Sequence, residues 1–109
     1  MMNSETPSPT PPELEAFRRE IDACDRELIE ILARRFGVVR RVGQFKIGAQ
    51  MEAIQPARAQ AVKDRAVRLG LEQGLDPDFM RRLYEVMIDY AHDLERDILA
   101  GAAEDKDAS

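Results

Sequence analysis

An apolar heptad repeat over residues 14–46 constrains the fold of this chain more than any other feature. Steps of four and three connect its positions without a break, and an apolar row flanks them at every seventh residue. The seam consists of Leu14, Arg18, Ile21, Asp25, Leu28, Leu32, Arg35, Val39, Val42 and Lys46, and the flanking row of Phe17, Cys24, Ile31, Val38 and Phe45. Because no proline lies between Pro12 and Pro56, the pattern predicts one long helix from Pro11 to Lys46.

A helix of this length is too long for one small domain. At about 1.5 Å per residue it extends roughly 54 Å, whereas a compact domain of this size has a radius of gyration of about 13 Å. The remaining residues are too few to cover the seam. We therefore expect an all-α fold with three helices per chain, assembled as an intertwined homodimeric helical bundle in which the long helices of two chains pack together.

Capping signals mark the start of the first helix and the limits of the second. Thr10 and Glu13 form a capping box around Pro11, which suits the first helical position. A second helix is expected over residues 56–71, with Gly74 near its carboxyl end.

The third helix is expected to begin at Asp76-Pro77, with Asp76 as its cap, and to end near Leu99, before Gly101. The domain organisation that follows is a disordered leader (1–10), a helical domain (11–100) and a flexible tail (101–109).

Composition excludes several functional classes. A net charge of −5 argues against general affinity for nucleic acid or membrane surfaces. A single cysteine, Cys24, precludes an internal disulfide, and a single histidine, His92, leaves little for a metal site. We expect His92 on the solvent face of the third helix, Cys24 buried as a small hydrophobe, and a cytoplasmic protein without a metal or cofactor.

The seam nevertheless carries cations that need a partner. Asp25 is one carboxylate and cannot neutralise three cations, and burying unpaired charge is costly. The inward cations are Arg18, Arg35 and Lys46, joined by Arg58, which shares the apolar spacing of the second helix. They either set the register of the bundle and snorkel to its edge, or bind a small ligand with more than one carboxylate.

Glu95 is the single acid on the apolar face of the third helix. It either faces the cation cluster as a counter-charge or lies at the margin of the stripe and pairs with a surface arginine.

Four motifs at fixed intervals resemble the all-helical class of chorismate mutases and their relatives, the isochorismate-pyruvate lyases. They are Arg18, the run from Ile21 to Arg35 (I-D-x-x-D-x-x-L-I-x-x-L-x-x-R), Lys46 eleven residues later with Arg58 after twelve more, and Gly74-Leu75-Asp76. The resemblance covers about residues 13–99.

The resemblance implies a dimer with two active sites, each built from both chains. Arg35 and Arg58 would bind the two substrate carboxylates, and Arg18 would reach in from the partner chain. Lys46 would lie at the ether oxygen of the breaking bond, together with Glu95, which can donate a hydrogen bond only when protonated.

Three positions depart from the mutase pattern. Gln55 and Ala59 stand where an aspartate and the acid that holds the ring hydroxyl often lie, and Ala91 replaces a serine. These residues would line the substrate ring.

The function implied is conversion of chorismate to prephenate in aromatic amino acid (Phe/Tyr) biosynthesis, a pericyclic rearrangement that needs no cofactor. The alternatives are an isochorismate-pyruvate lyase that leads to salicylate, an aminodeoxychorismate mutase, and a non-catalytic helical dimerisation module. A regulatory enzyme partner is compatible with this sequence but cannot be read from it.

Overall fold

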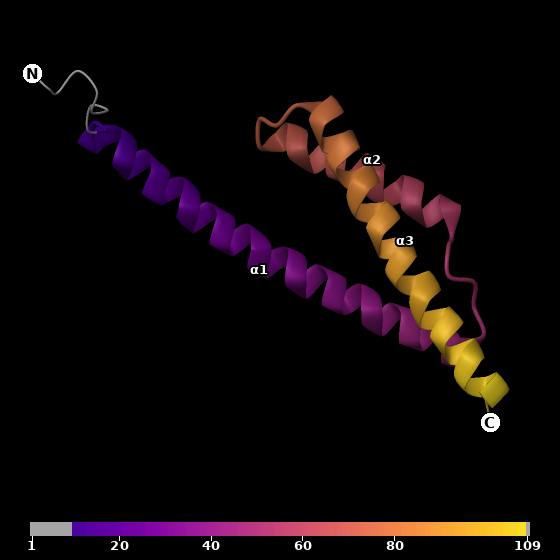
Figure 1. The fold of residues 1–109 in the computed structure, drawn as a ribbon. Helices are drawn as coiled ribbons and strands as arrows, with labels where there is room; N and C mark the ends of the chain where they lie inside the picture. Colours follow the sequence, from indigo (N-terminus) through magenta and orange to yellow (C-terminus); the bar gives the residue numbers. More distant parts are fainter. Residues whose placement is uncertain (1–9, 109) are drawn as a thin grey trace, which may run out of the picture. The chain divides into compact units, whose positions relative to one another are not determined.

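The computed structural model describes residues 10–108, with side chains through residue 103, as three α-helices (Figure 1). They are α1 (Pro12–Ala49), α2 (Pro56–Glu72) and α3 (Pro77–Ala108). The predicted all-α class with a long first helix is confirmed. The predicted leader falls almost entirely on residues 1–9, which lie outside the described residues.

Helix α1 begins one residue later than predicted. The carbonyl of Pro11 accepts hydrogen bonds from the backbone N–H groups of Leu14 and Glu15, at 3.0 and 3.1 Å. Pro11 therefore precedes the helix, and Pro12 takes the first helical position, where a missing N–H has no cost.

The turn between α2 and α3 has the predicted chemistry. Gly74 has a φ of +79°, and the next N–H, from Leu75, bonds to the carbonyl of Gly70 at 2.8 Å, which ends α2. The carboxylate of Asp76 then accepts a hydrogen bond from the N–H of Phe79 at 2.9 Å and so caps α3.

The predicted end of the third helix is wrong. Helix α3 continues through Gly101 to Ala108 instead of ending near Leu99. Gly101 lies between Ala100 and Ala102, and alanine is the strongest helix former, so one glycine does not end the helix.

The chain divides into two compact units, one up to Arg35 and one from Phe36 onward. The first unit is described from residue 10 and consists of the first 24 residues of α1, none of which is buried. Phe17, Ile21 and Leu28 of the seam and its flanking row are each more than half exposed, and Cys24, expected to be buried, is exposed.

The second unit has a small core between α2 and α3. Met80, Met87, Ile88 and Ala91 of α3 are buried, as is Ala66 of α2. The two helices approach closely at Gly70, where a Cβ atom would lie 2.5 Å from Met80 Cγ. The last part of α1 joins the same unit through the rings of Phe36 and Tyr90, whose centroids are 4.8 Å apart.

Candidate functional site

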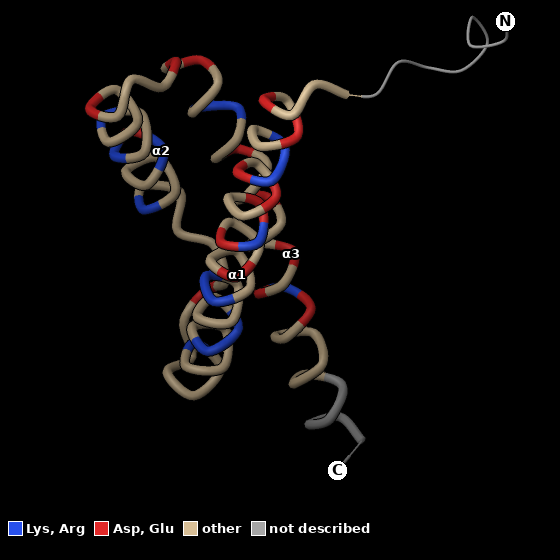
Figure 2. The backbone as a smooth tube through the Cα atoms, turned by 90° about the vertical axis from the view of Figure 1, so that its left-hand side faces the viewer, with Lys and Arg blue, Asp and Glu red and all other residues tan. Residues whose placement is uncertain are grey.

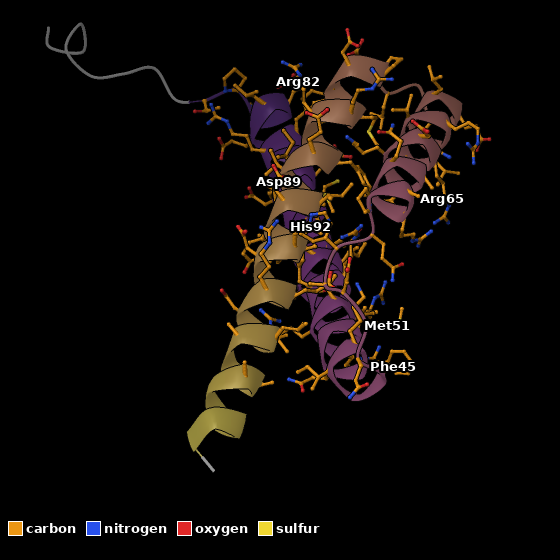
Figure 3. The ribbon with its side chains drawn as sticks, turned by 90° about the vertical axis from the view of Figure 1, so that its right-hand side faces the viewer. Phe45, Met51, Arg65, Arg82, Asp89 and His92 are labelled. Carbon is orange, nitrogen blue, oxygen red and sulfur yellow. The ribbon has the colours of Figure 1, made fainter. Side chains whose placement is uncertain are left out.

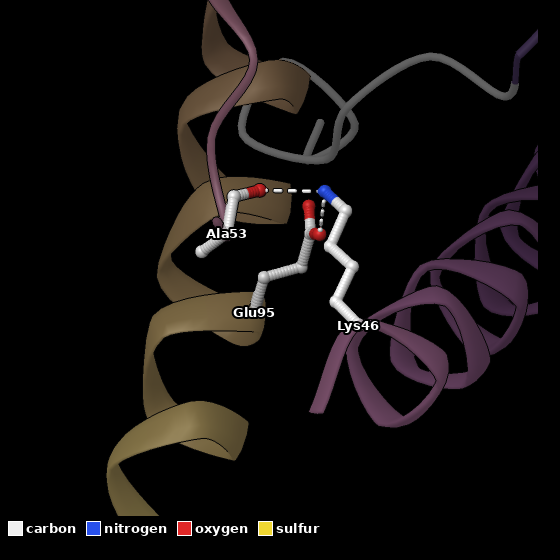
Figure 4. Close-up of polar contacts among 3 residues, drawn as sticks. All are labelled: Lys46, Ala53 and Glu95. Atoms are coloured by element: carbon white, nitrogen blue, oxygen red, sulfur yellow. Dashed lines mark hydrogen bonds and ion pairs between the residues drawn. The ribbon is translucent and has the colours of Figure 1, made fainter. Parts of the chain in front are cut away.

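The Lys46 ammonium connects three elements of the second unit (Figure 4). Its Nζ donates a hydrogen bond to Glu95 Oε1 of α3 and another to the carbonyl oxygen of Ala53 in the α1–α2 connection, both at 2.6 Å. The side chains of Lys46 and Glu95 are only 12% and 8% exposed. Glu95 is therefore the counter-charge of Lys46, and the alternative of a surface arginine partner is wrong.

The carboxyl end of α1 brings the Ala53 carbonyl to this place. Gln50 has a φ of +57°, the N–H of Met51 bonds to the carbonyl of Lys46 at 2.9 Å, and the N–H of Gln50 bonds to the carbonyl of Ile47 at 3.2 Å. This is a Schellman ending, which reverses the chain direction. The connection thus holds Lys46 twice, once by its backbone carbonyl and once by its ammonium.

The ion pair leaves one donor for a ligand. An ammonium has three N–H donors, and Glu95 and Ala53 accept two of the three on Lys46. Among the side chains described, no third acceptor bonds to Lys46 Nζ, and no buried side-chain nitrogen or oxygen lacks a partner. In this arrangement Glu95 accepts a hydrogen bond, and its predicted role as a donor stays a prediction.

The start of α2 and the middle of α3 supply the remaining site residues predicted in this unit. Arg58 lies in the first turn of α2 and is exposed, and Ala59 beside it is half-buried. Gln55 holds the N-cap position, and its amide makes no cap hydrogen bond. Ala91 is buried on α3, one turn before Glu95.

Arg18 and Arg35 belong to the first unit. The side chain of Arg18 is 57% exposed, and its guanidinium pairs with Glu15 at 3.0 Å, one turn earlier on the same helix. Arg35 is half-buried and is the last residue of that unit. The structure therefore brings together Lys46 and Glu95, while the shared site with Arg18 and Arg35 stays a prediction.

A pocket of about 230 Å³ borders Lys46 and the later part of α3. Besides Lys46 it is lined by Ile47, Gln50, Met51, Leu99, Ala102 and Ala103. Phe45 and Met51, at this end of α1, are both exposed (Figure 3). Lys46 is the one predicted site residue among these lining residues.

Two residues that help to position Lys46 could not be recognised from the sequence. Ala53 acts through its backbone carbonyl, which carries no side-chain signal. Gln50 adopts the left-handed conformation that usually selects glycine. No side-chain pattern between the first two expected helices indicates that the chain turns back to Lys46.

Charges of both signs follow all three helices and do not gather on one element (Figure 2). His92, expected on the solvent face with Asp89, is half-buried (Figure 3). Among the described residues no three His, Cys, Asp or Glu side chains are grouped to hold a metal ion. Within the same residues, none of the helices is long and apolar enough to cross a bilayer.

Comparison with known proteins identifies relatives over most of the chain. The family model described as chorismate mutase type II matches residues 17–96. A 4-amino-4-deoxychorismate mutase of Streptomyces venezuelae is 38% identical over 76 residues, which cover 70% of this chain and 74% of the relative. One of Streptomyces pristinaespiralis is 33% identical over 87 residues, covering 80% and 67%. A chorismate mutase of Methanocaldococcus jannaschii is 22% identical over 86 residues, covering 79% and 87%.

Proposed function

The chain belongs to the chorismate mutase type II family and is an isomerase of the chorismate mutase type, and from this premise we propose that its substrate is 4-amino-4-deoxychorismate. The observation that carries the substrate is the pair of Streptomyces relatives, which are 38% and 33% identical over 70% and 80% of this chain. Their names specify an amino group where chorismate has a ring hydroxyl.

The ring-lining positions are compatible with this substrate. Ala59 and Ala91 present methyl groups, which neither donate nor accept hydrogen bonds to a ring substituent. Gln55 has an amide that no cap hydrogen bond occupies, and its oxygen can accept from an amino group. In this proposal Gln55 binds the ring substituent and the two alanines shape the space around the ring.

Lys46 acts at the ether oxygen. In the rearrangement a C–O bond breaks while a C–C bond forms in the same molecule, and negative charge develops on the ether oxygen. The third N–H of Lys46 is the donor for that charge, and the bonds to Glu95 and Ala53 hold it in place before the substrate arrives. A donor that needs no reorganisation in a water-poor site stabilises a transition state most effectively.

The two substrate carboxylates are bound by Arg35 and Arg58, with Arg18 from a second chain. The exposed seam of the first unit supports this dimer, because Ile21, Leu28 and their neighbours have no cover within that unit. Two copies that pack these seams together cover both and complete two sites.

Chorismate itself is the second candidate, favoured by the description of the family model and by the archaeal relative. Steady-state assays of the purified protein with 4-amino-4-deoxychorismate, chorismate and isochorismate separate the candidates. We expect kcat/KM for the amino substrate to exceed that for chorismate by at least about tenfold, or about 1.4 kcal/mol.

Lys46→Met serves as the control for contaminating mutase and should lack activity on every substrate. Faster turnover of chorismate would replace the proposed substrate with the second candidate. Formation of salicylate from isochorismate would indicate a lyase activity that the proposal does not include.

A further inference from the structure

Helix α1 contacts α3 at a residue without a side chain. Among the 38 residues of α1, Gly43 alone is buried. A Cβ atom on Gly43 would lie 3.2 Å from Cδ1 of Ile98, 3.5 Å from its Cγ2 and 3.6 Å from its Cβ. The first of these distances is shorter than ordinary van der Waals contact, so an alanine at position 43 would require the Ile98 side chain to shift by a few tenths of an ångström.

This contact lies next to the ion pair on both helices. Lys46 follows Gly43 by three residues on α1, and Glu95 precedes Ile98 by three on α3, so each pair shares one helical face. The same two turns therefore hold the Gly43–Ile98 contact and the 2.6 Å hydrogen bond from Lys46 to Glu95. A displacement of α1 from α3 at Gly43 also displaces Lys46 from Glu95.

We propose that Gly43 is a positioning residue, which sets the separation of α1 and α3 at which the Lys46 ammonium bonds to Glu95 and Ala53 together. The inference rests on the proposed function, in which Lys46 acts at the ether oxygen. It concerns the geometry of that site and does not depend on which ring substituent the substrate carries.

Glycine at position 43 makes the helix less stable than alanine would, so its presence there needs an explanation. Glycine inside a helix is less favourable than alanine by about 1 kcal/mol. Gly48, also within α1, is exposed, and a Cβ on it would meet nothing within 4 Å. The two glycines thus form a matched pair on one helix, one against α3 and one in the open.

The test compares Gly43→Ala, Ile98→Val, their combination and the control Gly48→Ala. Gly43→Ala should lower kcat about tenfold while KM changes less than about twofold, because a small misplacement of a catalytic group affects the transition state more than substrate binding. Valine lacks Cδ1, the atom that an alanine methyl would meet at 3.2 Å, and the 3.5 Å neighbour that remains is an ordinary contact. The combination should therefore recover most of kcat, whereas Gly48→Ala should leave kcat unchanged.

NMR of the Lys46 ammonium provides a readout independent of turnover. A signal protected by its two hydrogen bonds should be visible in the wild type and in the combination, and should broaden in Gly43→Ala. The proposal would be overturned if Gly43→Ala kept the full kcat and an unchanged ammonium signal. It would also be overturned if the double variant with Ile98→Val recovered neither kcat nor the signal.

If Gly43→Ala does not fold, the combination carries the test by itself. A folded and active combination supports the proposal, and an unfolded or inactive one contradicts it. If the wild type turned over no substrate, the proposed function would fail, whereas the ammonium signal would still report on Gly43.

Discussion

The two parts of α1, which belong to different units of the chain, differ in how far their residues are buried. Residues 12–35 of α1 bury no side chain within their own unit, and Phe17, Ile21 and Leu28 are more than half exposed. Residues 36–49 bury Gly43 against Ile98 and carry Lys46, whose ammonium is bonded to another helix and to a connection. The carboxyl-terminal part of α1 thus packs against other elements of its unit, whereas residues 12–35 bury no side chain.

This difference teaches that the seam has two kinds of polar residue. Lys46 has a buried counter-charge in the same chain, which makes it part of a formed cluster. Arg18 pairs with the exposed carboxylate of Glu15 one turn away, and such pairs contribute between about 0 and 1 kcal/mol of stability. We attribute the exposed seam and Arg18 to the interface of the proposed dimer.

The largest effect is expected from mixing two inactive variants. If Arg18 and Arg35 serve one site from different chains, Arg18→Ala and Arg35→Ala are each inactive alone. A heterodimer of the two then has one site with both lesions and one site with neither. Random exchange of chains should restore about a quarter of wild-type activity, measured after unfolding and refolding the mixture.

Refolding each variant alone is the control and should restore nothing. Sedimentation of the mixture should show dimers throughout. A folded monomer, or a dimeric mixture without activity, would remove the proposed explanation of the exposed half of α1.

A smaller effect is expected from breaking the ion pair of the second unit. Glu95→Leu leaves the Lys46 ammonium buried with the Ala53 carbonyl as its acceptor. Because loss of one partner of a buried ion pair is strongly destabilising, the free energy of unfolding should fall by about 3–5 kcal/mol. Glu95→Gln keeps the shape and an acceptor oxygen, so it should retain substantial activity and most of the stability. Urea unfolding and kcat measure the two consequences.

The pair of Asp93 and Arg96 on the same helix is the matched control. Its atoms are 3.4 Å apart and both side chains are more than half exposed. Asp93→Ala should therefore lower the free energy of unfolding by less than about 1 kcal/mol.

The smallest effect is expected at the carboxyl end of α1. Gln50 has a φ of +57°, which costs a residue with a Cβ more than it costs glycine. Gln50→Gly should raise the free energy of unfolding by about 0.5–1 kcal/mol. Gly74→Ala, at a φ of +79° where α2 ends, should lower it by a similar amount. If both substitutions changed the free energy of unfolding in the same direction, the explanation from positive φ angles would be contradicted.

Much of the local structure could be predicted from particular residues. Asp76 caps α3 and Gly74 ends α2 because each signal acts within a few residues of its own position. Gly101 misled the prediction of the end of α3, because a single glycine weighs less than the alanines around it. The place of Glu95 on the apolar face of the third helix made it a candidate counter-charge for the inward cations, but the sequence did not decide between that role and a surface arginine partner.

The sequence by itself determined the three helices, their apolar faces and which charged residues lie on those faces, since helical periodicity depends on neighbours only a few residues apart. The tertiary structure decided which faces meet. Lys46 and Glu95 are separated by 49 residues, and their 2.6 Å contact depends on the close approach of α1 and α3 at Gly43. The Ala53 carbonyl enters the cluster only because the chain turns back after Gln50. A backbone acceptor has no residue type, so no pattern of side chains could have shown it.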